Sequence, residues 1–67
     1  MEITLNNNIE VFTGESLTIA DIIRIKNFTF RLLVIKVNGK LVKKDERDKV
    51  TVKEGDDVLI LHLISGG

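Results

Sequence analysis

The most constraining feature of this sequence is an apolar, β-branched run that ends in Asn-Gly. Leu32 to Val37 is almost entirely apolar, Asn38-Gly39 follows directly, and Lys40 to Val42 returns with apolar residues. Asn-Gly suits a type I′ turn, whose two central residues both need a positive φ. The pattern therefore predicts a β-hairpin in which every second residue of the first strand, beginning at Leu33, lies on one face.

The size and charge of the chain exclude several classes of protein. It has 67 residues, no Cys, and ten basic residues balanced by ten acidic ones, so we expect one small domain. Neither disulfides nor thiolate metal sites can reinforce it, and the lone His62 cannot form a metal site by itself. A net charge of zero gives no electrostatic footprint for nucleic acid. Met1-Glu2-Ile3 lacks the basic start of a signal peptide, and no apolar run reaches the ~20 residues that span a membrane. We therefore expect a cytoplasmic protein with no nucleic-acid or membrane partner.

The N-terminal segment predicts a second hairpin. Met1 to Leu5 alternates apolar and polar residues, Asn6-Asn7-Asn8 interrupts the alternation, and Ile9 to Phe12 begins to alternate again. Asn tolerates the left-handed conformations that tight turns need. We expect the two strands to share one apolar face made of Ile3, Leu5, Ile9 and Val11.

A helix is predicted from Thr18 to about Asn27. Thr18 can cap the first turn, and Asp21, three residues later, can complete a capping box. Leu17 and Ile22 fit the hydrophobic staple that often accompanies such a cap. At helical spacing, the buried stripe would consist of Ile19, Ile22 and Ile23.

The second half of the chain adds short strands and a charged segment. Lys43 to Lys49 mixes charges of both signs, which is typical of a solvated loop or a single helical turn. Val50 to Val52 indicates a short strand, Lys53 to Asp56 a turn, and Val58 to Ile64 the last strand. Phe28 to Arg31 is compatible with a loop or with the start of a strand. Together the elements predict an α+β fold, with a mixed four- to five-stranded sheet and one main helix packed on one face.

The last strand is apolar on both of its faces. Val58 and Ile60 point one way. The other face carries Leu59, Leu61 and Leu63. A strand in a sheet covered by one helix normally has a solvated face, so these three leucines would form an exposed stripe, and such stripes usually mark partner sites. The alternative is a central strand whose second face is partly covered by the loop after the helix.

The sequence ends in Ser65-Gly66-Gly67, directly after this strand. Glycine has no Cβ, so a Gly-Gly end can enter a narrow channel and leaves the terminal carboxylate unhindered. A frayed terminus or a cloning remnant would look the same. Three residues extend about 10 Å at most. If a partner protein acts on the carboxylate, the leucine stripe would therefore dock close to the catalytic centre of that partner. We divide the chain into a domain from residue 1 to 64 and a flexible tail from 65 to 67.

Signatures of catalysis are missing from the sequence. Ser16 and Ser65 stand in no nucleophile motif, and a pair of Ser65 with His62 would lie on alternate faces of a strand end. Asn38-Gly39 and Glu54-Gly55 are single turn glycines rather than phosphate-binding loops. We assign no catalytic or metal-binding residue and do not expect an enzyme. His62 is expected as a polar residue at the sheet edge, with contact to a partner as the less favoured alternative.

Four segments occur in a characteristic order. Gly14 to Ile23 leads into the helix, Val34 to Val42 forms strand, turn and strand, Gly55 to Val58 precedes the last strand, and Gly66-Gly67 ends the chain. In this order and total length, the chain resembles the ThiS/MoaD group of ubiquitin-like sulfur carriers, and the short length favours the ThiS type. The resemblance implies a β-grasp fold.

The resemblance also implies a mechanism and partners. In this family an E1-like adenylating enzyme uses ATP to adenylate the terminal carboxylate, here that of Gly67. A persulfide then displaces AMP and leaves a thiocarboxylate. Ser65 and Gly66 would form the tail that threads into the active site, and the chain itself would bind no cofactor. The sulfur would pass to an acceptor synthase, either a thiazole synthase-like enzyme of thiamin synthesis or the large subunit of molybdopterin synthase.

Other functions with the same tail remain open. Thiamin thiazole synthesis is the favoured pathway, and a MoaD-like small subunit of molybdopterin synthase is its alternative within the family. A ubiquitin-like modifier joined to other proteins through Gly67 needs the same C-terminus. A plain binding module with an inert tail is a third possibility.

Overall fold

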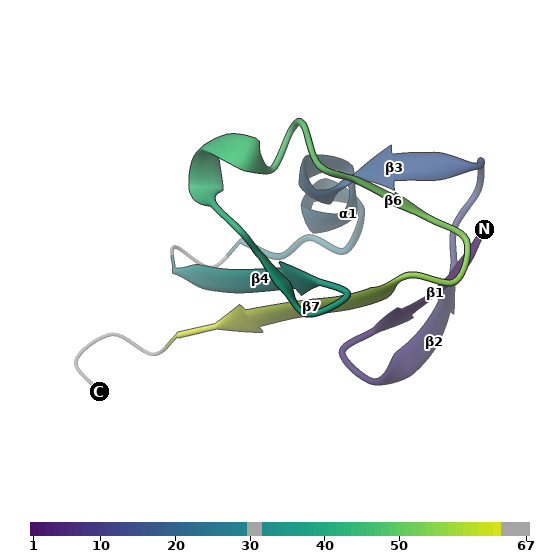
Figure 1. Cartoon of the computed structure of the whole chain (residues 1–67), viewed down its shortest axis with the longest axis horizontal. Helices are drawn as coiled ribbons and strands as arrows, with labels where there is room; N and C mark the ends of the chain where they lie inside the picture. The colour runs from purple at the N-terminus through teal and green to yellow at the C-terminus, as the bar shows by residue number, and fades with distance from the viewer. Residues whose placement is uncertain (30–31, 64–67) are drawn as a thin grey trace.

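The computed structural model describes residues 1–29 and 32–63, and Figure 1 shows how their elements are arranged. In this part of the chain one α-helix lies over one face of a five-stranded sheet. The elements in chain order are β1 (Glu2–Leu5), β2 (Asn8–Val11), β3 (Ser16–Thr18), α1 (Ile19–Ile25), β4 (Leu33–Val37), β5 (Lys40–Val42), the 3₁₀ turn η1 (Lys44–Glu46), β6 (Thr51–Lys53) and β7 (Asp57–His62). Among the described helices, none has the length and apolar character needed to cross a membrane.

β7 lies at the centre of the sheet, whose strand order is β2-β1-β7-β4-β5. It runs parallel to β1 and antiparallel to β4, so the sheet is mixed. The predicted α+β architecture, with one helix on a mixed sheet, is confirmed. β3 and β6 form a separate antiparallel pair, and β3 is a strand that the sequence did not predict.

Both hairpins of the main sheet close through two-residue turns with positive φ. Asn6 and Asn7 have φ of 51° and 69°, and Asn38 and Gly39 have φ of 51° and 82°, as a type I′ turn requires. The side chain of Asn38 also accepts a hydrogen bond of 2.9 Å from the backbone N–H of Asp57. The predicted Asn-Gly hairpin is therefore confirmed, and it is tied to the first residue of β7.

The predicted face of Ile9 and Val11 is wrong. The two-residue turn places Asn8 opposite Leu5, and it therefore places Ile9 opposite Thr4. Residues opposite each other share a face of the sheet. Leu5 is on the buried inner face, so its neighbour Thr4 is on the outer face, and Ile9 lies there as well. Ile9 and Val11 are accordingly 70% and 75% exposed. Three consecutive Asn residues left the turn length open, and a shift of one residue moves every side chain of a strand to the other face.

Caps define both ends of α1. The Thr18 hydroxyl accepts the Asp21 N–H at 3.0 Å, and the Asp21 carboxylate accepts the Thr18 N–H at 3.1 Å, which confirms the predicted capping box. The hydrogen bond from the Thr18 backbone, followed by that from the Arg24 side chain, holds the pKa of Asp21 below its usual value. At the other end Asn27 has a φ of 58°, and the Phe28 N–H donates back to the last turn of the helix. This is a Schellman ending with Asn in the place of Gly.

The charged segment from Lys43 to Lys49 contains the single helical turn that was one of its predicted forms, η1. The carbonyl of Arg47 accepts the N–H of Ala20 at 2.8 Å, and the carbonyl of Val50 accepts the N–H of Ile19 at 3.0 Å. The first amides of a helix have no partner within the helix itself. Arg47 in this segment and Val50 directly after it therefore satisfy two of them and hold the start of α1.

The core lies between α1 and the inner face of the sheet. Ile19 and Ile22 of the predicted helical stripe are fully buried, and Ile23 packs against them as a partly buried side chain. Phe28, which the Schellman ending turns inward, packs against the same cluster. The buried apolar residues are Ile3, Leu5, Phe12, Ile19, Ile22, Ile35, Val42, Val52, Val58 and Ile60.

Replacing Thr18 with Ala should lower the free energy of unfolding by about 1 kcal/mol, because the Asp21 N–H loses its acceptor. Urea denaturation followed by circular dichroism measures the change. Thr13→Ala, at an exposed position outside any helix, is the matched control. Equal stability of the two variants would contradict the contribution of the cap.

Candidate functional site

The candidate site is the outer face of the sheet, on the side opposite α1. β7, at the centre, sends Val58 and Ile60 into the core, where they are 0% and 5% exposed. Leu61 and Leu63 are 47% and 54% exposed, and Leu59 is half-buried. The predicted alternation of the last strand is thus found in the described residues. Partner binding by the three leucines stays a prediction.

Neighbouring strands extend this surface. The strand register places Val34 of β4 opposite Leu61. It also places Lys36 opposite both Leu59 of β7 and Leu41 of β5, and Leu41 is more than half exposed. We call the resulting surface the outer apolar face. It consists of Val34, Leu41, Leu59, Leu61 and Leu63.

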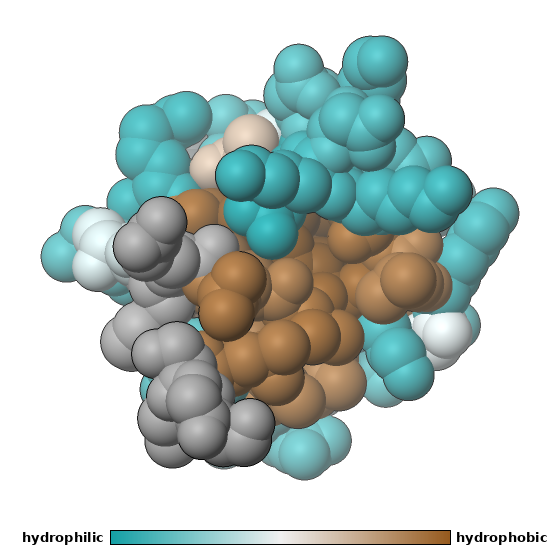
Figure 2. Space-filling model, turned by 90° about the vertical axis from the view of Figure 1, so that its left-hand side faces the viewer, coloured by the Kyte–Doolittle hydropathy of each residue, from teal (hydrophilic) through white to brown (hydrophobic). Residues whose placement is uncertain are grey.

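A groove of about 380 Å³ lies at the end of the outer apolar face, next to the C-terminal end of β7. Its lining includes the apolar Leu32, Val34, Leu41 and Leu63 and the basic Lys43, Lys44 and Arg47. Figure 2 views the molecule from this end and shows hydrophobic surface across the middle, with hydrophilic side chains above it. The groove therefore combines an apolar floor with a positively charged rim.

The loop after the helix does not cover the leucines as far as the structure describes it. Phe28 packs against the core on the inner side of the sheet. Residues 30 and 31 lie outside the described part of the chain. β7 is central, as the alternative interpretation of the sequence required, but Leu61 and Leu63 are still exposed.

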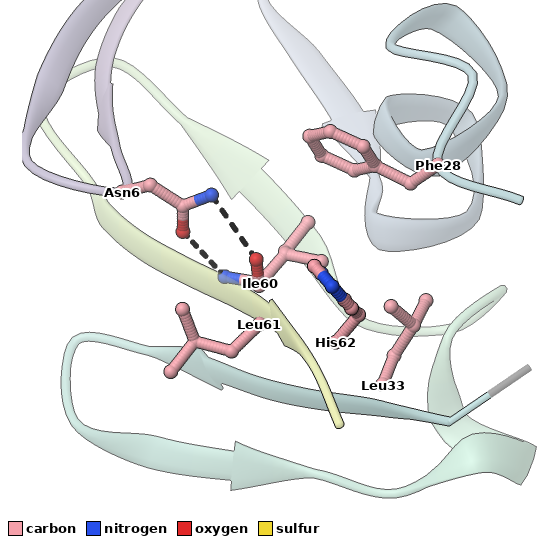
Figure 3. A pocket seen from close by; sticks show the side chains of 6 residues that line it. All are labelled: Asn6, Phe28, Leu33, Ile60, Leu61 and His62. Carbon is pink, nitrogen blue, oxygen red and sulfur yellow. Dashed lines mark hydrogen bonds between the residues drawn. The ribbon is translucent and has the colours of Figure 1, made fainter. Parts of the chain in front are cut away.

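A smaller pocket of about 240 Å³ lies beside the end of β7 (Figure 3). Its lining consists of Asn6, Phe28, Leu33, Ile60, Leu61 and His62. Figure 3 shows the His62 imidazole beside Leu33 and on the side of Phe28, whereas Leu61 points the other way. The register places His62 opposite Leu33, so it lies on the face that the leucines do not occupy, and it is exposed. The predicted position at the sheet edge is wrong, because His62 is the last residue of the central strand.

The Asn6 side chain anchors β7 at this pocket. Its Nδ2 donates to the carbonyl of Ile60 at 3.0 Å, and its Oδ1 accepts the N–H of Ile60 at 2.8 Å. Sequence reasoning recognised Asn6 only as a turn residue. It missed this contact because the two residues are 54 positions apart and no local pattern links them.

The described residues present exposed apolar side chains on the outer face of the sheet. Within residues 1–29 and 32–63 no three potential metal ligands among His, Asp and Glu come together. Both pockets are lined mainly by apolar side chains. The predicted tail residues Ser65, Gly66 and Gly67, and the predicted domain end at residue 64, lie outside the described residues.

Known structures share this architecture over the whole chain. The crystal structure of the thiamine biosynthesis protein ThiS from Geobacter metallireducens is 28% identical, with a TM-score of 0.88 and 100% of each chain covered. An NMR solution structure of a thiamine biosynthesis protein from the same organism is also 28% identical, with a TM-score of 0.80, and covers 100% of this chain and 88% of that one. The model of the ThiS family matches residues 3–67. The fold is a β-grasp, and the chain belongs to the ThiS family of ubiquitin-like sulfur carriers.

Proposed function

We propose that this chain carries sulfur as a thiocarboxylate on Gly67 and delivers it to the synthesis of the thiamin thiazole. The observation that best supports this function is the outer apolar face, which ends at Leu63, just before the Ser65-Gly66-Gly67 tail. Both similar structures belong to thiamine biosynthesis proteins, which favours the thiazole pathway over molybdopterin synthesis. In this role the chain is a co-substrate, and its partner enzymes perform the chemistry.

The proposed chemistry begins with activation of the Gly67 carboxylate. A carboxylate is a poor electrophile, so an E1-like enzyme joins it to the AMP part of ATP and releases pyrophosphate. A persulfide sulfur attacks the acyl carbon and AMP leaves. A thiol then cleaves the resulting acyl disulfide and releases the thiocarboxylate. Because the chain has no Cys, it cannot carry sulfur as a persulfide of its own.

The outer apolar face, which precedes the tail, is the proposed contact surface for the partner enzyme. The three tail residues reach about 10 Å at most, so the contact surface must lie close to the partner's catalytic centre. Among the described residues, Leu61 and Leu63 are the exposed large apolar residues nearest to the tail in sequence, and burial of apolar area is the main favourable contribution to protein association. Lys43 and Lys44 on the groove rim favour a partner with acidic residues around its own apolar contact.

The activating enzyme of the same host should catalyse the exchange of pyrophosphate into ATP when this chain is present. Deleting Gly66 and Gly67 should abolish that exchange. The deletion leaves the terminal carboxylate on Ser65, two residues short of its normal reach, and removes no residue of the core, so circular dichroism should show an unchanged fold. Ser65→Ala keeps the length of the tail and should retain the exchange. Undiminished exchange with the truncated chain would contradict the role of Gly67.

Leu61→Asp should leave the fold intact and raise the KM of the activating enzyme for this chain about tenfold, because the carboxylate loses water when the partner docks. Ile60→Asp, the neighbouring control, should unfold the domain, because Ile60 is 5% exposed and an unpaired charge there is costly. Circular dichroism and the pyrophosphate exchange assay separate the two effects. Unfolding of Leu61→Asp would place Leu61 in the core, and a folded variant with unchanged KM would remove it from the docking surface.

A further inference from the structure

The pairing between β1 and β7 ends at Val58, the second of the six residues of β7. The two strands pair at Thr4 with Asp57 and at Leu5 with Val58. The ladder with β4 continues past this point, and the N–H of Leu63 still donates to the carbonyl of Leu32 at 2.9 Å. The last residues of β7 therefore pair with β4 on one side. On the other side they have no partner strand in the described part of the chain, because β1 has already ended.

Asn6 continues the hydrogen bonding where β1 ends. Its backbone N–H donates to the carbonyl of Val58 at 2.9 Å. Its side chain then bonds both the N–H and the carbonyl of Ile60, at 2.8 Å and 3.0 Å. The carboxamide thus occupies the place that the next residue of a pairing strand would take. Figure 3 shows these two hydrogen bonds beside Leu61.

Asn suits this position for two separate reasons. Residue 6 has a φ of 51° in the turn, a conformation that Gly, Asn and Asp tolerate best. The contact with Ile60 needs one donor and one acceptor on the same short side chain. A carboxamide has both, an ionised carboxylate only accepts, and Gly has no side chain. Asn alone among these three residues therefore meets both requirements.

We propose that Asn6 is a positioning residue for sulfur transfer. It holds β7 at Ile60 from the side opposite β4, and so it fixes the orientation of the end of β7, which the tail follows in sequence. This inference rests on the proposed function, in which the Gly67 carboxylate must reach a catalytic centre in another protein. Correct orientation of a reacting group contributes strongly to rate, and β7 is the last described element before the tail in sequence.

The test compares Asn6→Gly with Asn7→Gly in the full chain. Asn7 lies in the same turn with a φ of 69°, and its side chain makes no hydrogen bond to β7 in the described residues. Gly tolerates the positive φ at both positions, so both variants keep the turn. They differ in the contact with Ile60. Asn6→Asp is a further variant that keeps an acceptor for the Ile60 N–H and loses the donor for its carbonyl.

The first readout is amide hydrogen exchange measured by NMR. The amide hydrogens of Leu61 and Leu63 should exchange about tenfold faster in Asn6→Gly than in Asn7→Gly, because the two hydrogen bonds between Asn6 and Ile60 are lost. The amide of Val52, in the separate β3–β6 pair, should exchange at the same rate in both variants. Asn6→Asp should also exchange faster than Asn7→Gly at Leu61 and Leu63. Equal exchange at Leu61 and Leu63 in Asn6→Gly and Asn7→Gly would overturn the proposal.

The second readout is thiocarboxylate formation by the activating enzyme with ATP and a persulfide donor. Asn6→Gly should lower kcat about tenfold relative to Asn7→Gly at an unchanged KM, because the side chains of the outer apolar face are all kept and only the hold on the end of β7 is lost. Faster exchange with an unchanged kcat would make Asn6 a structural residue and overturn its role in transfer. A wild-type chain that never acquires a thiocarboxylate would instead remove the proposed function and the transfer role together, and the exchange result would still decide whether Asn6 holds β7.

Discussion

The structure depends on β7, the strand that joins the two hairpins of the sheet. It pairs in parallel with β1 and antiparallel with β4, and its inner residues Val58 and Ile60 belong to the core. Its outer residues Leu59 and Leu61 belong to the outer apolar face. One strand therefore closes the core on one side and presents the candidate docking surface on the other. For this reason we expect substitutions at adjacent positions of β7 to alter stability and the proposed partner binding separately.

Asn side chains fix β7 at two points along its length. Asn38 accepts the N–H of Asp57 at the start of the strand, and Asn6 bonds both backbone groups of Ile60 further along. Both residues also adopt the positive φ of their turns. A Gly at either place would satisfy the backbone and contribute no contact. In a domain this small, where the core by itself gives only modest stability, turn residues that also hold the central strand are a substantial part of the fold.

Local patterns were predictable from the sequence, and contacts between distant residues were not. The capping box of Thr18 and Asp21, the Asn38-Gly39 turn and the alternation along β7 each depend on residues close in sequence, and each is confirmed. The face of Ile9 was mispredicted because three consecutive Asn residues are compatible with more than one turn length. The Asn6 contact with Ile60 connects the two ends of the domain, and no periodicity or motif indicates it.

The candidate site was predictable to a similar degree. Apolar residues on both faces of the last strand indicated the exposed Leu61 and Leu63. The contributions of Val34 and Leu41, and the basic rim of the groove, depend on which strands flank β7, and the sequence did not establish that order. The role of the tail came from the resemblance to a family, because Gly-Gly by itself is compatible with several functions.

The proposed function requires that the Gly67 carboxylate of this chain carries sulfur. Mass spectrometry of the intact chain, purified from its native host without reducing or alkylating reagents, tests it most directly. If Gly67 carries sulfur, the spectrum contains a species heavier than the unmodified chain by the difference between one sulfur and one oxygen atom, with the extra mass on the C-terminal fragment. Isopeptide-linked adducts of the chain with other proteins, in the absence of any such thiocarboxylate species, would contradict it.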